Sequence, residues 1–381
     1  MATGSSFDTQ MMSRAIALAE KGRYTTRPNP CVGCVIVYQN KIIGEGFHQR
    51  AGEGHAEVNA LQMVHDNGHT AQGATAYVTL EPCSHYGRTP PCALGLIQAK
   101  VARVVVAVTD ANPDVSGRGI AMLREAGIDV DVGLLAEQAY DLNLGFMKRM
   151  KTGLPWVTVK IAASLDGKTA LSNGVSKWIT GDAARADVQK YRASHCALIT
   201  GVDTILADDP SLNVRYGSLG SLTKNLSAAD VFQPLRVVLD SRARLTAAQQ
   251  LFAIPSPILL VSGCDYPDAV KAAFPKQVTC LRLDCDPSGR ILLPALLTYL
   301  GQSCNSVLIE AGATLAGAFV GQGLTDDVVL YQAAKILGSH GRNMLLLDDY
   351  TAMDQAPKLQ LIDERNIGQD KRYILRYQQS D

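Results

Sequence analysis

The first half of the chain alternates between amphipathic helical stretches and short apolar strands. Residues 7–21 carry apolar side chains at helical spacing, and Asp8 is expected to cap the start of this helix. Residues 32–38 and 42–48 are apolar strands on either side of Gln39-Asn40, which predicts a hairpin. The alternation then continues with helices over 55–67, 93–99, 117–127 and 135–147 and strands over 75–80, 101–108 and 128–132. Such a series predicts a three-layer α/β domain.

The second half repeats the alternation after a break. Residues 148–155 are basic and contain Gly and Pro, so they predict a boundary between two domains, residues 1–150 and 151–381. Residues 182–192 have the pattern of a helix, whereas 217–230 are rich in Ser, Gly and Asn and predict a mobile loop. Buried strands are expected over 156–163, 197–201, 235–239, 258–261, 278–283, 306–309 and 326–333, and a final pair of strands over 359–376.

The amino-acid composition indicates which kinds of ligand or partner the chain is expected to bind. The chain has 381 residues, with 36 Lys plus Arg against 36 Asp plus Glu, so its net charge is zero. A neutral chain has no overall field that attracts nucleic acid, and this favours free nucleotides over polymers as ligands. No apolar run is long enough to span a bilayer, and the first residues lack the layout of a signal peptide. The nine cysteines are odd in number and unevenly spaced, which predicts reduced thiols and a cytoplasmic location.

Two stretches combine into the pattern of a catalytic zinc site. His55 and Glu57 form a His-x-Glu sequence, and Cys83, which follows a proline, is succeeded by Cys92. One imidazole and two thiolates leave the fourth position of a zinc ion open for water, as catalysis requires. Glu57 is expected to flank that water as the general acid and base. The pattern is typical of zinc-dependent base deaminases, except that eight residues separate the two cysteines, and these residues, 84–91, have the composition of a loop.

Other residues allow competing interpretations. Cys31 and Cys34 form a Cys-x-x-Cys pair, but a strand begins within it, so packed small side chains are favoured over a redox or zinc motif. The amide of Asn29 can read a pyrimidine edge or can simply form a turn. The stretch from Glu310 into residues 312–317 has the pattern of a strand, a Gly turn and a helix start, which suits a cofactor phosphate. It is neither a dinucleotide fingerprint nor a P-loop, so a tight turn packed by small residues remains an alternative.

Together these stretches resemble the bifunctional riboflavin-biosynthesis deaminase/reductase of bacteria, and the resemblance covers nearly the whole chain. The long spacing between Cys83 and Cys92 is the one that this family shows. The resemblance rests on Pro28-Asn29-Pro30-x-Val32-Gly33, His55-Ala56-Glu57, the run from Glu81 to Cys92, the run from Lys160 to Lys168, Leu206-Ala207-Asp208-Asp209-Pro210 and Glu310-Ala311-Gly312.

The resemblance implies a cytidine-deaminase-like first domain and a dihydrofolate-reductase-like second domain. It implies zinc-dependent deamination of 2,5-diamino-6-(5-phosphoribosylamino)pyrimidin-4-one, followed by NADPH-dependent reduction of the ribosyl chain to ribityl phosphate. It also implies a homo-oligomer, a dimer or a tetramer, with no nucleic-acid or membrane partner. The competing function is a nucleobase or nucleoside deaminase whose second domain binds a nucleotide without catalysis.

Matching positions also imply the ligand contacts. The expected NADPH contacts are Ala162, Trp178, Thr204, Asp208, Ser241, Gly312, Ala313, Thr314, Leu315, Ala316 and Gly317. The expected substrate contacts are Asn29 and His48 in the first domain and Ser176, Arg192, Leu212, Arg215 and Glu310 in the second. Among these, Arg192 and Arg215 suit a sugar phosphate, because a guanidinium binds phosphate in a fork. Lys160 and Asp166 are further candidates for orienting the substrate or supplying a proton.

Overall fold

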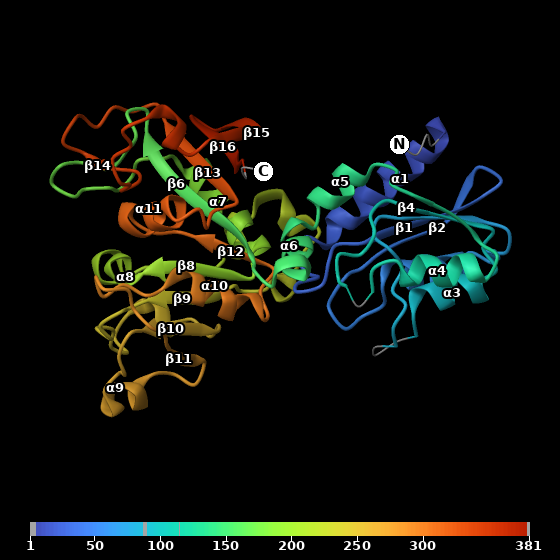
Figure 1. The fold of residues 1–381 in the computed structure, drawn as a ribbon, viewed down its shortest axis with the longest axis horizontal. Helices are drawn as coiled ribbons and strands as arrows, with labels where there is room; N and C mark the ends of the chain where they lie inside the picture. The colour runs from blue at the N-terminus through green and yellow to red at the C-terminus, as the bar shows by residue number, and fades with distance from the viewer. Residues whose placement is uncertain (1–4, 87–89, 114, 379–381) are drawn as a thin grey trace. The chain divides into compact units, whose positions relative to one another are not determined.

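The computed structural model divides the chain into two compact units, Met1–Leu154 and Pro155–Asp381 (Figure 1). It describes residues 5–86, 90–113 and 115–378. None of the helices in these ranges has both the length and the apolar character needed to cross a membrane. Each unit has its own sheet and its own core, and each is described by itself below.

The first unit is built on a five-stranded sheet in the order β2-β1-β3-β4-β5. β1 is antiparallel to both of its neighbours, whereas β3, β4 and β5 run parallel to one another. The strands are β1 (Gly33–Tyr38), β2 (Lys41–Phe47), β3 (Thr75–Val78), β4 (Arg103–Val106) and β5 (Asp129–Val132). The predicted hairpin is confirmed, and its turn residues Gln39 and Asn40 both have positive φ, 50° and 61°, as a two-residue hairpin turn requires.

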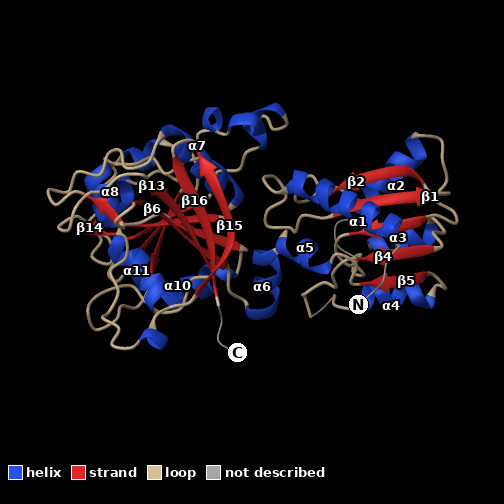
Figure 2. Cartoon of the chain, turned by 90° about the horizontal axis from the view of Figure 1, so that it is seen from above, coloured by secondary structure: helices blue, strands red, loops and turns tan. Residues whose placement is uncertain are grey.

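Helices cover both faces of this sheet (Figure 2). One core cluster joins α1 (Ser6–Ala19) and α5 (Ala136–Asp141) to one face, and the other joins α2 (Ala56–Asp66), α3 (Cys92–Gln98) and α4 (Arg118–Glu125) to the opposite face. The predicted three-layer α/β architecture is therefore confirmed.

Glycines in β2 let α2 lie directly on the sheet. A Cβ atom at Gly46 would come within 2.4 Å of both the Ala56 carbonyl oxygen and the Ala60 nitrogen, and one at Gly44 would come within 2.4 Å of the Ala60 carbonyl oxygen. Real Cβ atoms do not approach backbone this closely, so only glycine permits the contact. The contact determines where α2 begins, and His55 is the N-cap residue at that point.

Two predictions for this unit were wrong in detail. The cap of α1 is Ser5, and Asp8 instead completes a capping box while its buried carboxylate accepts hydrogen bonds from Tyr77 and Arg103. The helix predicted over 135–147 is two helices, α5 and α6 (Leu144–Thr152), because the Asn143 side chain is committed elsewhere. Its amide binds the backbone N–H and carbonyl of Cys31 at 2.7 and 2.8 Å.

The second unit contains a nine-stranded sheet in the order β11-β10-β9-β8-β12-β6-β13-β16-β15. The seven strands from β11 to β13 are parallel, so their carboxyl ends share one edge, where open α/β sheets bind ligands. The strands are β6 (Trp156–Ser164), β8 (Ala197–Gly201), β9 (Leu235–Leu239), β10 (Ile258–Ser262), β11 (Val278–Arg282), β12 (Ser306–Ile309), β13 (Asp327–Ala333), β15 (Leu359–Ile367) and β16 (Asp370–Tyr377).

Five helices pack with this sheet, and β7 (Lys168–Ala170) pairs with β14 (Arg342–Asn343) in a small sheet of its own. The helices are α7 (Asp182–Ser194), α8 (Val202–Asp208), α9 (Asp268–Ala273), α10 (Leu293–Gly301) and α11 (Ala313–Gly321). Residues 217–230, predicted as a loop, lie within a stretch of three 3₁₀ turns: Tyr216–Ser218, Gly220–Lys224 and Ala228–Asp230. β11 was predicted to be buried, but it is the edge strand and is largely exposed.

Candidate active sites

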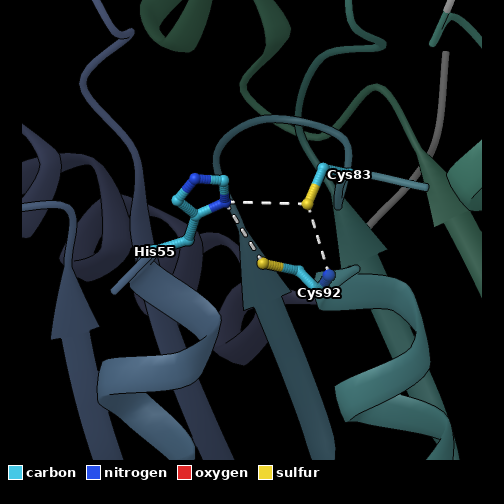
Figure 3. A group of neighbouring side chains, drawn as sticks. All are labelled: His55, Cys83 and Cys92. Atoms are coloured by element: carbon cyan, nitrogen blue, oxygen red, sulfur yellow. Dashed lines mark hydrogen bonds between the residues drawn. The ribbon is translucent and has the colours of Figure 1, made fainter. Parts of the chain in front are cut away.

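The three predicted zinc ligands meet at one point of the first unit (Figure 3). His55 caps α2, Cys83 follows β3, and Cys92 is the first residue of α3. The Nδ1 atom of His55 lies 3.6 Å from the Cys83 sulfur and 3.3 Å from the Cys92 sulfur. All three donor atoms lie within 4.8 Å of one another, a spacing that suits a tetrahedral ion bonded to each of them at about 2.0–2.3 Å.

The donor set fits zinc in an open, catalytic coordination. Among the described residues, no fourth His, Cys or carboxylate joins the group. One position of a tetrahedral ion would therefore fall to water, as in catalytic zinc sites.

Two helix N-termini surround the cluster and favour negative charge on its sulfurs. The Cys92 backbone N–H, at the start of α3, donates a hydrogen bond to the Cys83 sulfur at 3.3 Å. Hydrogen bonds from Cys92 and His55 lower the pKa of Cys83, whereas the shared hydrogen bond with Cys83 and burial raise the pKa of Cys92. A metal ion bonded to both sulfurs requires both as thiolates, so metal binding releases any proton that they carry.

Glu57 lies beside the cluster in the first turn of α2 and is almost fully buried. Burial raises the pKa of its carboxyl group to about 7. Such a value is suited to a group that takes up and gives back a proton near neutral pH.

Asn29 and His48, both expected to contact the pyrimidine, lie together. The Asn29 Nδ2 atom is 3.0 Å from His48 Nε2, and His48 Nδ1 is 3.1 Å from the Gly54 carbonyl oxygen. Because burial lowers the pKa of His48, we assign a neutral ring that carries its proton on Nδ1 and accepts from Asn29. This ring packs edge-on against His55 at 5.3 Å between centroids, so Asn29 and His48 adjoin the metal ligands.

Glu81, for which no role was predicted, organises the ligand-bearing loop. Its buried carboxylate accepts four backbone N–H groups, from Asp110, Gly117, Gly119 and Ile120, at 2.9–3.2 Å. These bonds attach the segment after β4 to the residues that deliver Cys83. The only signal in the sequence is a glutamate directly before Pro-Cys.

The Cys-x-x-Cys pair and the loop between the two cysteine ligands are the remaining predicted features of this unit. Cys34 packs in the core and Cys31 contacts Thr26, so the Cys-x-x-Cys pair is a packing feature, as favoured from the sequence. Of the predicted loop 84–91, residues 87–89 lie outside the described residues. Tyr86, which precedes them, is exposed.

The second unit carries a cleft of about 1260 Å³ along the carboxyl edge of its sheet. Most of the predicted contacts line it: Ala162, Ser176, Trp178, Arg192, Thr204, Asp208, Leu212, Ser241, Glu310, Gly312, Ala313, Thr314 and Leu315. Ala316, Gly317 and Arg215 are not among the lining residues. Gly317 instead packs on the Leu346 backbone, where a Cβ atom would come within 2.0 Å of the carbonyl oxygen.

The fit to a dinucleotide rests on two features of this cleft. Gly312 is the N-cap of α11, and its surroundings are open enough that an added Cβ would meet nothing within 4 Å. A diphosphate can therefore approach the free N–H groups of that helix. The exposed Trp178 indole, with the Arg185 guanidinium 4.3 Å from its ring centroid, offers an aromatic surface to a cofactor ring.

A group of half-buried charged residues lines this cleft. Arg192 donates to both oxygens of Glu310, at 2.6 and 2.9 Å, and to the Asn213 carbonyl at 3.0 Å. The Arg192 fork expected to bind a sugar phosphate is therefore already occupied by Glu310. Lys160 also lines the cleft, and burial lowers its pKa while Glu310 opposes the shift.

The carboxylate of Asp166 is occupied by hydrogen bonds within the protein. It accepts hydrogen bonds from the Ser164 hydroxyl and from the backbone N–H groups of Leu337 and Gly338. These bonds join two turns, and Asp166 is not among the residues that line the cleft.

Two family models match the chain, one for each unit. Residues 5–108 match the cytidine and deoxycytidylate deaminase zinc-binding region, and residues 155–372 match the RibD C-terminal domain. The second match supports the reductase-like fold expected of that unit.

Full-length relatives agree with both matches. The riboflavin biosynthesis protein RibD of Escherichia coli (strain K12) is 46% identical over 365 residues, covering 95% of this chain and 97% of the relative. The corresponding protein of Haemophilus influenzae is 46% identical over 374 residues, covering 96% of each chain.

Solved structures extend the likeness to the fold. Acinetobacter baumannii RibD (form 1) gives a TM-score of 0.88 at 46% identity, covering 98% of this chain and 99% of that one. The Thermotoga maritima diaminohydroxyphosphoribosylaminopyrimidine deaminase/5-amino-6-(5-phosphoribosylamino)uracil reductase gives 0.84 at 31% identity, covering 97% and 99%.

Proposed function

The chain belongs to the RibD family of bifunctional deaminase/reductases of riboflavin biosynthesis, and on this premise we propose that its two units catalyse two successive reactions at the two sites described above. Zinc and NADPH are the cofactors of this enzyme. The observation that carries the proposal is the convergence of His55, Cys83 and Cys92 beside the buried Glu57.

The first unit is proposed to deaminate 2,5-diamino-6-(5-phosphoribosylamino)pyrimidin-4-one. His55, Cys83 and Cys92 would hold zinc, which when bound supplies a Lewis acid and lowers the pKa of its water toward about 7. Glu57 takes one proton from the attacking water and gives it to the ring nitrogen; it then takes the second proton, from the hydroxyl group on the attacked carbon, and gives it to the amino group, which departs as ammonia. Asn29 and His48 orient the pyrimidine, because the Asn29 amide donates to the His48 ring while its carbonyl oxygen, which no donor in the described part of the chain binds, can accept from the substrate.

The second unit is proposed to reduce the ribosyl chain of the deaminated product to ribityl phosphate. NADPH supplies the hydride when bound along the cleft, with its diphosphate at the N-terminus of α11. Glu310 is held by Arg192 and can accept a sugar hydroxyl, and Lys160 is placed beside it as a donor. Since Arg192 is committed to Glu310, Arg215, whose charge also acts on the Glu310 carboxylate, is the better candidate for the sugar phosphate.

The test follows both products in one reaction. Zinc-loaded protein is given the diaminopyrimidinone ribosyl phosphate and NADPH, and ammonia release and NADPH oxidation are recorded together. We expect ammonia first and then an equimolar loss of NADPH. Ammonia without NADPH loss would leave a deaminase with a nucleotide-binding second unit. Neither signal, with zinc shown to be bound, would reject the proposed substrate.

We also propose that the enzyme works as a homo-oligomer in the cytoplasm on this small molecule alone. The cysteine pattern supports the location, and the family resemblance supports the oligomer. Light scattering on the purified protein and fractionation of cells would test the two points separately.

A further inference from the structure

Residues 211–215 form a short loop without helix or strand that carries two of the expected substrate contacts of the second unit. Leu212 lines the cleft and is buried, and Arg215 is exposed. Leu212 has a φ of 54°, in the left-handed region that residues other than glycine rarely adopt. A bulky residue keeps such a conformation only where its surroundings hold it there. Other parts of the structure must therefore fix the backbone of this loop.

Two arginine side chains bind the loop backbone on either side of Leu212. Before it, the Arg236 guanidinium donates to the Ser211 carbonyl at 3.1 Å. After it, the Arg192 guanidinium donates to the Asn213 carbonyl at 3.0 Å. Arg236, on β9, is fully buried, and its further hydrogen bonds also go to backbone carbonyls. The two guanidinium groups thus fix the peptide groups that flank Leu212.

Two glutamine side chains bind the rest of the loop. The Val214 N–H donates to Oε1 of Gln233 at 2.7 Å, and Nε2 of Gln233 donates back to the Val214 carbonyl at 3.1 Å. A carboxamide can do both because it carries a donor and an acceptor. The Arg215 N–H donates to Oε1 of Gln189, a buried residue of α7, at 3.0 Å. Buried backbone groups need such partners, so these bonds set the path of the chain.

All of these hydrogen bonds end on backbone atoms, so they hold the loop without occupying the side chains of Leu212 and Arg215. The Arg215 charge acts on the Glu310 carboxylate, which also lines the cleft. A loop that already has its binding conformation loses little freedom when a ligand arrives. The apparent affinity of a ligand falls in proportion to the fraction of protein in the competent conformation. Loosening this loop should therefore weaken substrate binding.

We propose that Gln233 and Gln189 are positioning residues of the reductase site, which hold residues 211–215 in the conformation that binds the pyrimidine ribosyl phosphate. The proposal rests on the reductase function proposed above and on the assignment of Leu212 and Arg215 to the substrate. Neither glutamine is among the residues that line the cleft, so both act through the loop backbone. Their effect belongs in the apparent affinity for the substrate and not in cofactor binding or hydride transfer.

The experiment supplies the deaminated intermediate and NADPH to the full-length protein, so that deamination does not enter. Gln233→Met keeps the length of the side chain but removes both hydrogen bonds to Val214. The KM for the intermediate is expected to rise by about tenfold. The kcat and the Kd of NADPH, measured from its fluorescence, should stay within about twofold. Gln233→Glu keeps the acceptor for the Val214 N–H and should recover part of the loss.

Hydrogen exchange, followed by mass spectrometry on a peptide that spans residues 211–216, tests the order of the loop itself. The amides of Val214 and Arg215 should exchange slowly in the unaltered protein, because both are bound to side-chain oxygens. This peptide should exchange faster in Gln233→Met, and saturating intermediate without NADPH should slow the exchange again.

The matched control is Gln277→Met. Gln277 is another half-buried glutamine whose side chain donates to a backbone carbonyl, that of Phe252 at 3.3 Å, but it does not line the cleft. Its substitution should leave the KM for the intermediate and the exchange of residues 211–216 unchanged.

The outcomes separate this inference from the function on which it rests. If exchange of residues 211–216 is unchanged in Gln233→Met, or rises while the KM stays the same, the positioning role is overturned and the reductase stands. An equal rise in the KM for the intermediate and the Kd of NADPH would also overturn it, since that indicates a general loosening of the unit. If the unaltered protein does not oxidise NADPH with the intermediate, the reductase function fails, and the positioning role fails with it.

Discussion

Glu57 is buried next to the three metal ligands but is not itself a ligand. A substitution of Glu57 is therefore expected to abolish catalysis without removing the metal. Glu57→Gln keeps the size of the side chain but removes its ability to accept a proton. We expect deamination to fall by about 10²–10⁴-fold, the usual contribution of a general acid or base, with zinc content unchanged. Ammonia release and metal analysis on the same preparation check this. Glu137→Gln, on the exposed surface of α5, is the matched control and should leave both deamination and zinc content unchanged. Full deaminase activity in zinc-loaded Glu57→Gln would remove the assigned role.

Asp8 illustrates how a single buried carboxylate makes the first unit sensitive to acid. Burial acts to raise the pKa of Asp8, but hydrogen bonds from Arg103 and Tyr77 outweigh it and hold the pKa well below its usual range. The folded-state pKa therefore lies below the unfolded value of about 3.9. The resulting stability is present above that value and is lost as pH falls from about 4 toward the folded-state pKa.

Asp8→Asn should consequently cost stability mainly near neutral pH. We expect a loss of about 1–3 kcal/mol in the free energy of unfolding at pH 7, typical of losing hydrogen bonds to a charged group, and a smaller difference at pH 3. Urea unfolding of both proteins, with zinc removed from each so that metal release does not enter, measures the two differences. The same loss at both pH values would contradict the linkage.

At the scale of elements, the position of α2 determines where His55 and Glu57 stand, and the glycines of β2 determine the position of α2. Gly46→Ala would drive a methyl group into the Ala56 carbonyl and the Ala60 nitrogen. We expect a cost of about 1–3 kcal/mol and weaker zinc retention, because the start of the helix must move away from the sheet. Thermal unfolding and zinc occupancy against a competing chelator measure the two effects.

Gly95→Ala is the control for that substitution. Gly95 lies within α3, and a Cβ atom there would make only an ordinary contact, 3.8 Å from a Leu61 methyl carbon. Alanine should stabilise this helix by up to about 1 kcal/mol and leave zinc in place. If Gly46→Ala retained zinc as well as Gly95→Ala does, the close approach of α2 to β2 would not be what positions the ligands.

The elements also show which parts of the structure a sequence can predict. α2 and α3 were predicted within one residue of their observed ends, and the zinc ligands, predicted from the His-x-Glu and Pro-Cys motifs, include the residues at the starts of these two helices, His55 and Cys92. Local periodicity and capping carry that information. The break between α5 and α6 was missed because it depends on Asn143 binding Cys31, 112 residues away. Neither the types of these two residues nor their spacing in the sequence indicates such a hydrogen bond.

At the two sites as well, contacts between residues distant in the sequence could not be predicted. Arg192 was expected to be free for phosphate, but its partner Glu310 is 118 residues distant in the sequence. Glu81 received no role because its four partners are backbone N–H groups, which any residue provides.

At the scale of the whole molecule, each unit contains every side chain assigned to its own reaction. The zinc ligands, Glu57, Asn29 and His48 all fall within residues 5–154, and the cleft and its charges fall within 155–378. We therefore expect the chemistry at each site to need no residue of the other unit. The two reactions are linked by the intermediate, which is the product of the first and the substrate of the second.

This arrangement predicts that two disabled full-length proteins complement each other. Glu57→Gln should lose deamination but still reduce the deaminated intermediate, and Lys160→Met should release ammonia but fail to oxidise NADPH. Mixed in equal amounts with the diaminopyrimidinone substrate, they should restore ammonia release followed by equimolar NADPH loss, after a lag that shortens as protein concentration rises. The lag reflects diffusion of the intermediate between molecules. A mixture that releases ammonia without oxidising NADPH, although Glu57→Gln reduces added intermediate, would show that the Lys160→Met protein does not release the intermediate into solution.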